Sequence, residues 1–341
     1  EKVEEKMKDK WTELRKQLEK TVIHKIAIQE EELEYQTQGE VPGHVLNQFS
    51  MSEKGDHFRI ATTKGRDWGG PIPSDESNES YSNVYILDQD MEVTGSVEEL
   101  APGERIYSAR FMQDRGYLVT FETMDPLFVI DLENPQDPEV LGKLKIPGFS
   151  NYLHPYNKNT LIGIGKDTDA EKWGVQEQGL KIALFDVSEV DDPKQVDTQI
   201  LGGSGSDSLA LDDHKAFLFN RERSLISIPV KLRTEATTTP VTEEEEMQTE
   251  ETQVRERSIR PPQPTPRPRY NYFRGAAVLN VEENELDLRG KIKHGEEENG
   301  SARIKRSLYI EDTLYTLSNE YMKMNELEDL EEIKELELEM E

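Results

Sequence analysis

The 341-residue sequence contains no cysteine, which excludes disulfide bonds, cysteine-ligated metal sites and cysteine nucleophiles. No apolar run approaches the roughly 18 residues that identify a membrane-spanning helix. Positive charge is scarce, because 41 Lys and Arg stand against 70 Asp and Glu and leave a net charge of −29. Binding to the phosphate backbone of a nucleic acid requires clustered Lys and Arg, so this composition argues against nucleic-acid partners.

The common catalytic motifs are missing as well. The sequence has no Walker loop, no Gly-x-Gly-x-x-Gly opening a helix, no His-Glu-x-x-His and no Gly-x-Ser-x-Gly. Its six histidines are scattered and show no short metal-ligand spacing. We therefore expect neither a catalytic residue set nor a bound cofactor.

Residues 1–20 predict a short amphipathic helix. Val3, Met7, Trp11, Leu14 and Leu18 recur every three or four residues, which places them on one helix face. At Thr21 the pattern changes to β-branched, strand-like sequence. The remainder, 21–341, is therefore expected to form one β domain that the helix packs against.

The β domain repeats a strand that ends in aspartate. Residues 128–131 and 184–186 are apolar strands ending in Asp131 and Asp186, and an Asp-Pro pair follows each at 137–138 and 192–193. A carboxylate at this position accepts hydrogen bonds from turn amides, and proline fixes φ in the turn. The repeated pair indicates two copies of one structural unit.

A glycine marker precedes each new unit, at 42–43, 102–103, 147–148 and 202–203. A strand, a polar turn and a second strand follow each marker, and a third and usually a fourth strand come later. Units of four short strands with a period of about 45–60 residues are typical of β-propeller blades. The sequence thus predicts an all-β propeller of four-stranded antiparallel blades.

We expect five complete blades, at about 44–101, 104–146, 149–201, 205–294 and 302–341. Residues 21–41 predict the outer two strands of a further blade, so we expect a ring truncated at its N-terminus, with more blades upstream. In the fourth blade, 208–211 and 216–219 predict the first two strands. Residues 225–229 are then an additional strand, an extended hairpin or an edge addition.

Polar insertions follow the second strand of three blades, at 64–82, 167–179 and 233–269, and are expected on one face of the disc. The stretch 232–269 is rich in Thr and Glu and then in Pro, a composition that predicts disorder. The C-terminal residues 327–341 alternate apolar residues with Glu, which predicts the outer strand of the last blade.

Several stretches in combination resemble a family of secreted proteins with a C-terminal β-propeller that is distantly similar to WD40 repeats. They lie at 39–43, 46–51, 100–112, 125–131, 152–155, 161–167, 213–219 and 303–309. The resemblance covers about 21–325 apart from the insertions. It implies a propeller, export to the cell surface or beyond it, and additional blades upstream, but no particular reaction.

Alternate residues of each innermost strand are expected to point into the central channel. Five polar residues at such positions are our ligand-binding candidates: Asn47, Arg110, His154, Asp207 and Lys305. A purely structural role, in which His154 is hydrogen-bonded within its blade, stands as the alternative.

A metal site has one weak set of candidates. Asp167 and Asp169, with Glu171 nearby, offer the oxygen ligands that Ca²⁺ prefers. The glycine and the final bidentate glutamate of a calcium loop are absent from their places, so an acidic solvated loop is the competing interpretation.

The repeat architecture, the resemblance and the missing catalytic motifs favour an exported, non-catalytic propeller that binds a protein or a cell-surface polymer. The alternative is a metal-dependent propeller enzyme that processes sugars or peptides at the channel mouth, with Asp207, His154 and Arg110 as its first candidates. A third interpretation is that the acidic surface mainly maintains solubility.

Overall fold

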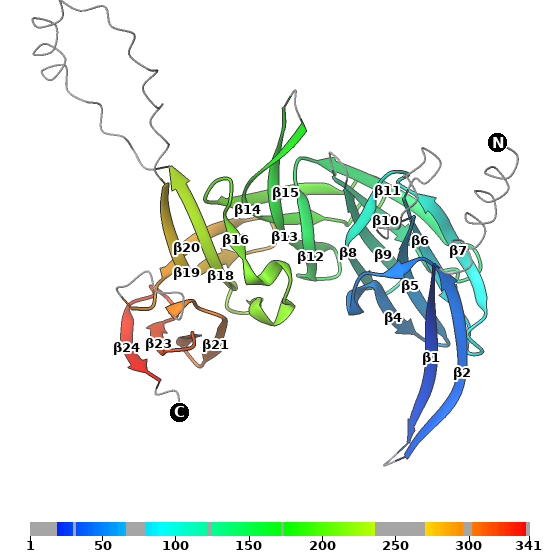
Figure 1. Ribbon diagram of the computed structural model, residues 1–341, viewed down its shortest axis with the longest axis horizontal. Coiled ribbons are helices and arrows are strands. Elements are labelled where there is room, and N and C mark those ends of the chain that lie inside the picture. Colours follow the sequence, from blue (N-terminus) through cyan, green and yellow to red (C-terminus); the bar gives the residue numbers. More distant parts are fainter. Residues whose placement is uncertain are drawn as a thin grey trace, which may run out of the picture.

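The computed structural model describes residues 19–29, 32–65, 80–121, 125–171, 174–235, 270–295 and 302–338. Apart from three short 3-10 helices, these residues form antiparallel strands in one two-stranded hairpin and five larger sheets. The sheets follow one another along an arc, and its two ends do not meet (Figure 1). The helix expected over 1–20 falls almost wholly outside the described residues.

The hairpin and the five blades have the following bounds. The hairpin consists of β1 (Lys20–Gln29) and β2 (Glu32–Pro42). Blade I consists of β3 (His44–Val45), η1 (Gln48–Ser50), β4 (Met51–Lys54), β5 (His57–Lys64), β6 (Tyr81–Leu87) and β7 (Val93–Leu100). Blade II consists of β8 (Arg105–Met112), β9 (Arg115–Phe121), β10 (Asp125–Asp131) and β11 (Glu139–Ile146).

Blade III consists of β12 (Phe149–Pro155), β13 (Thr160–Glu171), β14 (Gly174–Asp186) and β15 (Lys194–Leu201). Blade IV consists of β16 (Asp207–Ser208), η2 (Leu209–Leu211), η3 (His214–Ala216), β17 (Leu218–Asn220), β18 (Leu225–Glu235), β19 (Tyr270–Val281) and β20 (Leu286–Ile292). Blade V consists of β21 (Arg306–Ile310), β22 (Thr313–Leu317), β23 (Tyr321–Glu326) and β24 (Glu332–Glu337).

In blades II, III and V, consecutive strands are hydrogen-bonded neighbours, as in β8-β9-β10-β11, whereas in blades I and IV two short inner strands both pair with the next strand. The predicted five blades of antiparallel strands are therefore confirmed, and β24 is the outer strand predicted at the C-terminus. The hairpin over 20–42 is the predicted pair of strands, and it packs Val41 against Ile60 and Leu87 of blade I. The expectation of further blades upstream stays a prediction.

Adjacent blades share their apolar cores. Ile164 and Leu184 of blade III and Ile226 and Leu279 of blade IV are fully buried in one such core. Equivalent cores join blades I and II, blades II and III, and blades IV and V. Burial of each large apolar side chain contributes about 1.5–3 kcal/mol, so the interfaces between sheets hold the arc together.

The aspartates that end the repeated strands act as the sequence predicted. The Oδ1 of Asp88, Asp131 and Asp186 each accepts a bond of 2.9 Å from the backbone N–H two residues later. Asp88 accepts a second bond, also of 2.9 Å, from the N–H of Glu92. Each carboxylate thus braces the turn between the third and fourth strands of its blade.

The predicted strands of blade IV were partly wrong. Residues 208–211 and 216–219 are not two strands, because η2 and η3 interrupt a single innermost strand between β16 and β17. β18 is consequently the second strand and not an additional one. Ser208 accepts a bond from Ala210 N–H and begins η2, an example of a short polar side chain competing with ladder pairing.

Blade I contains the same interruption, since the strand predicted over 46–51 is mostly the helix η1. Two of the predicted insertions are also shorter than expected. β13 and β14 continue pairing as far as Glu171 and Gly174, and β18 runs to Glu235. The segments 66–79 and 236–269 lie outside the described residues, as does most of the predicted disordered stretch. Among the residues that the structure describes, no helix is long and apolar enough to cross a membrane.

The glycine markers are places where the backbone enters a blade in the left-handed region. φ is +89° at Gly43, +86° at Gly103, +87° at Gly148 and +68° at Gly202. At Gly148 a Cβ would also collide with the carbonyl oxygen of Lys166. Only glycine satisfies both conditions without moving the backbone.

We therefore expect Gly148→Ala to destabilise the protein by about 3 kcal/mol or more, since backbone strain and a steric clash add together. Gly55→Ala is the matched control, because φ is +58° there and nothing lies within 4 Å of the added Cβ. It is expected to cost only about 1 kcal/mol. Urea unfolding followed by circular dichroism measures both changes, and equal losses in the two variants would contradict this account of the blade entry.

Candidate functional site

The inner parts of four blades meet at Phe49, the central residue of η1. The Phe49 ring centroid lies 5.3 Å from that of Tyr152 in blade III and 4.9 Å from that of His214 in blade IV. The guanidinium of Arg110, in blade II, lies 4.4 Å from the Phe49 ring centroid. We call Phe49, Arg110, Tyr152, His154 and His214 the hub.

Arg110 ties blade II to blade III. Its Nε donates to the Leu153 carbonyl at 3.1 Å, and its Nη2 donates to the Tyr152 hydroxyl at 3.3 Å. Burial lowers the pKa of Arg110, partly offset by Tyr152, and raises the pKa of Tyr152. Arginine remains protonated in proteins, so the hub contains one fixed cation that is covered by two aromatic rings.

The hydrogen-bond network sets the tautomer of His154. The Tyr152 hydroxyl accepts from Arg110, so its own proton is available to the Nδ1 of His154, 3.0 Å away. His154 Nδ1 is then the acceptor, and the ring carries its proton on Nε2. The ring packs between Phe217 and Phe219, with both centroid separations at 4.9 Å.

His154 is uncharged at neutral pH. Burial, assisted by the nearby Arg110 cation, lowers its pKa from 6.5 to about 4. A neutral imidazole held by a tyrosine and two phenylalanines braces the hub, which agrees with the structural alternative considered for this residue.

A cavity of about 260 Å³ opens beside the hub. The rings of Phe49, Tyr152 and His214 form part of its wall, and Asn47, Gln48 and Asn151 line it with amide groups. The amide of Gln48 lies 3.3 Å from His214 Nε2, and Asn47 Oδ1 accepts from Phe49 N–H at 2.9 Å. The cavity thus combines flat apolar surfaces with hydrogen-bonding groups.

Asn151 is the lining residue with spare hydrogen-bonding capacity. Its Oδ1 is buried and has no hydrogen-bond partner among the residues that the structure describes. The register of β12 against β13 shifts between Ser150 and Tyr152, which places Asn151 in a bulge. A buried acceptor without a partner costs about 1–3 kcal/mol, so it marks a place where a ligand donor would be stabilised.

Three of the five predicted ligand-binding residues lie in or beside this site. Asn47 lines the cavity, while Arg110 and His154 form the hub behind it. Lys305 is exposed at the entrance to blade V; its backbone N–H donates to the Leu317 carbonyl and its carbonyl accepts from Arg306. The candidate set is therefore not one site.

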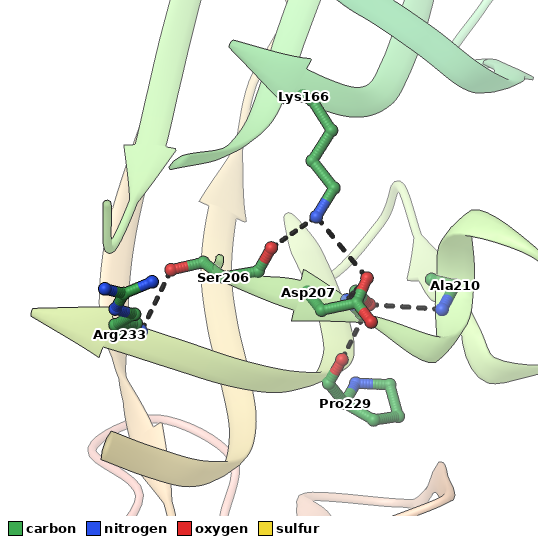
Figure 2. A network of polar contacts seen from close by, with 7 residues as sticks. Lys166, Ser206, Asp207, Ala210, Pro229 and Arg233 are labelled. Carbon is green, nitrogen blue, oxygen red and sulfur yellow. Dashed lines mark hydrogen bonds and ion pairs between the residues drawn. The ribbon is translucent and has the colours of Figure 1, made fainter. Parts of the chain in front are cut away.

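Asp207 lies in a separate polar network between blades III and IV (Figure 2). Its side chain is 52% exposed, and its Oδ1 lies 3.4 Å from Lys166 Nζ. Lys166 also donates to the carbonyl of Ser206, whose hydroxyl accepts from Arg233 N–H at 2.9 Å. Lys166 crosses from β13 to β16, so this network joins two blades.

The weak calcium candidates lie on a strand. Asp167 and Asp169 are part of β13, where Asp169 pairs with Gln176 of β14 and Asp167 lies in a bulge, so the loop predicted for them was wrong. Across the described ranges, no group of three or more His, Asp or Glu side chains is arranged to hold a metal ion.

Sequence reasoning missed most of the cavity wall. Gln48 and Phe49 belong to a 3-10 turn, and Asn151 belongs to a bulge, so strict alternation along a strand assigns these residues to the wrong side. Asn47 was the one sequence feature that could have indicated the 3-10 turn. Asn and Ser favour the first position of such a turn, where their side chains accept a backbone N–H, as Asn47 does in η1 and Ser208 does in η2.

The shifted pKa of His154 predicts a pH dependence. In the unfolded chain the group titrates near 6.5, and in the folded protein at about 4, so the unfolded chain takes up the proton first as the pH falls. The contribution of the uncharged imidazole to the free energy of unfolding is therefore complete above pH 6.5 and is lost as the pH falls from there to 4. Over this interval, we expect the free energy of unfolding of His154→Gln to decrease by about 2 kcal/mol less than that of wild type.

Urea unfolding at several pH values between 4 and 7.5 measures the difference. His24→Gln serves as the control, because His24 lies on the exposed face of β1. Parallel pH profiles for wild type and His154→Gln would show that His154 does not titrate as described.

The chain matches the β-propeller domain family model over residues 4–330. It is 36% identical over 280 residues to an uncharacterized protein of Methanocaldococcus jannaschii, and this alignment covers 82% of this chain and 35% of that protein. It is 38% identical over 214 residues to an uncharacterized protein of Archaeoglobus fulgidus, and this alignment covers 63% of this chain and 30% of that protein. The chain therefore spans about a third of the length of these relatives.

Two solved structures of AztD from Citrobacter koseri are also similar. The apo structure aligns with a TM-score of 0.46 at 13% identity, and the alignment covers 89% of this chain and 63% of the AztD chain. The second structure aligns with a TM-score of 0.43 at 11% identity, and that alignment covers 91% of this chain and 70% of the AztD chain. The matched family model, which extends over nearly all of the described sheets, shows that the chain belongs to the β-propeller domain family.

Proposed function

We propose that this chain is a non-catalytic binding module of a cell-surface or secreted protein, and that the cavity beside the hub is its ligand site. The observation that carries the proposal is the buried Oδ1 of Asn151, a residue that lines the cavity and whose Oδ1 has no partner among the described residues. Folding leaves this acceptor unused at a cost, and a bound donor group would remove that cost.

The lining favours a small, uncharged, polar ligand of the saccharide class. Aromatic rings offer flat faces for sugar C–H groups, and the amides of Asn47, Gln48 and Asn151 offer both donors and acceptors. The one ionised group in the wall is Asp212, which disfavours anions. A volume of about 260 Å³ lies below the roughly 300–1,000 Å³ of drug-sized sites, so the bound part is small.

The terminal sugar of a cell-surface polymer has these properties. The setting at the cell surface rests on the sequence resemblance to secreted propeller proteins. The binding role rests on the cavity and on the firmly braced hub beside it, where His154 is held uncharged. A rigid wall lowers the entropic cost of binding, because few side chains must be ordered when the ligand enters.

The experiment is a thermal-shift titration of the chain with glucose, galactose, N-acetylglucosamine and their di- and trisaccharides. A ligand that binds only the folded state stabilises it by about 2.7 kcal/mol at a concentration of 100 times Kd. We expect at least one saccharide to raise the melting temperature in a saturable way. The absence of any shift with every saccharide would sink the proposal.

Asn151→Ala separates binding from stability. The variant is expected to weaken the active saccharide about tenfold, the equivalent of one hydrogen bond. Its stability without ligand is expected to equal or exceed that of wild type, because no folded-state bond is lost. Asn157→Ala is the control, since Asn157 bonds Glu283 on another surface and is expected to leave binding unchanged. Unaltered affinity in Asn151→Ala would remove the central argument.

A further inference from the structure

A second polar surface lies away from the hub, where blade IV extends past its own outer strand. The last β19 residue that pairs with β20 is Ala276, whereas β18 and β19 remain paired as far as Glu235 and Tyr270. The two strands therefore continue as a two-stranded extension, which projects from blade IV in Figure 1. We call residues 231–235 and 270–275 the ribbon.

One face of the ribbon is basic and aromatic. The register pairs Lys231 with Arg274, Arg233 with Tyr272, and Glu235 with Tyr270, so these side chains share one face. Three cations thus accompany two carboxylates on this face, those of Glu235 and of Asp207, which pairs with Lys231, although the whole chain has a net charge of −29. Such a local excess of positive charge attracts anionic groups.

The tyrosine rings on this face are already covered by cations. Arg233 lies 3.4 Å from the Tyr270 ring centroid, and Lys231 and Arg274 each lie 5.7 Å from that of Tyr272. The rings hold the cations in place and still leave Tyr272 41% exposed. Because their faces are occupied, these rings are not a platform for stacking sugars.

The ribbon also has an open backbone edge. Within the described ranges, no strand pairs with 270–275 on the side of β19 away from β18. The opposite edge is partly covered, since Gly203 N–H donates to the Arg233 carbonyl and Arg233 N–H donates to Ser206 Oγ (Figure 2). Unpaired N–H and C=O groups on an edge strand are a template for pairing with another chain.

We propose that the ribbon binds an acidic polypeptide segment in extended form, which adds as a strand to the open edge of β19. Alternate side chains of an added strand would project on the same side as Lys231, Arg233 and Arg274, where carboxylates would pair with them. The open edge offers alternating N–H and C=O groups at strand spacing, which the backbone of an extended polypeptide matches, and this favours a polypeptide partner.

The end of blade IV that carries the ribbon is also the side on which the chain enters blade V. β20 ends and β21 begins on the same side of the arc as the ribbon, because successive strands alternate in direction. Lys305 lies at that entrance to blade V and is exposed. This residue, predicted from the sequence as a ligand contact, therefore lies on the ribbon's side of the arc and outside the hub.

The experiment is a fluorescence-anisotropy titration of the full chain against a fluorescein-labelled ten-residue peptide that alternates Glu and Thr. We expect saturable binding that weakens as salt is added, because salt screens the attraction between partly exposed charges. The double variant Lys231→Glu/Arg274→Glu is expected to bind at least tenfold more weakly. The double variant Lys143→Glu/Lys145→Glu, on the exposed outer strand of blade II, is the charge-matched control and is expected to bind as wild type does.

A second peptide tests the added strand. Methylation of the backbone nitrogens at alternate residues removes donors without changing the charge, and it is expected to abolish binding. Equal binding of the methylated peptide would overturn strand addition. Arg274→Gln, which removes one charge without introducing an opposite one, is expected to weaken binding about threefold and guards against a double variant that does not fold.

Three other results would overturn the proposal. They are no binding of the acidic peptide, binding of polygalacturonate in its place, and peptide binding only after the six acids between 243 and 251 are changed to Gln. The last result would identify this chain's own acidic segment as the occupant. Asn151→Ala is expected to bind the peptide normally, so failure at the ribbon and failure at the hub cavity are separate outcomes.

Discussion

Neighbouring blades cover each other's apolar faces, and the rest of the structure depends on these shared cores. Each shared core contains fully buried side chains from two adjacent sheets, as with Ile164 and Ile226. The chain enters blades at glycines with positive φ because the backbone there passes close to the second strand of the blade, as Gly148 does at Lys166. Packing of the blades around the hub also accounts for the interrupted inner strands, because 3-10 turns in blades I and IV bring Phe49 and His214 into contact.

The sequence was informative wherever one residue type performs one local task. Glycine at blade entries and aspartate at strand ends recur because φ and turn bonding demand them, so the repeat could be recognised without a structure. The hub cavity could not be predicted, since its wall is made where strand periodicity fails. Asn151 lies in a bulge and Phe49 in a 3-10 turn, and neither position follows from alternation.

Two polar surfaces of opposite character result from this architecture. The hub cavity is lined by amides and aromatic rings, with its cation, Arg110, covered by rings and bonded to backbone. The ribbon instead presents half-buried cations beside a free strand edge. Asp207 and Lys305, assigned from the sequence to one channel, lie outside the hub because the inner strands that hold them enter the blades at its periphery.

The central claim is that four blades together build a small saccharide site at the hub. A crystal structure of the chain grown with the saccharide that gives the largest thermal shift tests this most directly. The account predicts density in the cavity, with a ligand hydroxyl within hydrogen-bond distance of Asn151 Oδ1 and a sugar face against Phe49 or Tyr152. Density for the saccharide at any other surface, with the cavity filled only by water, would contradict it.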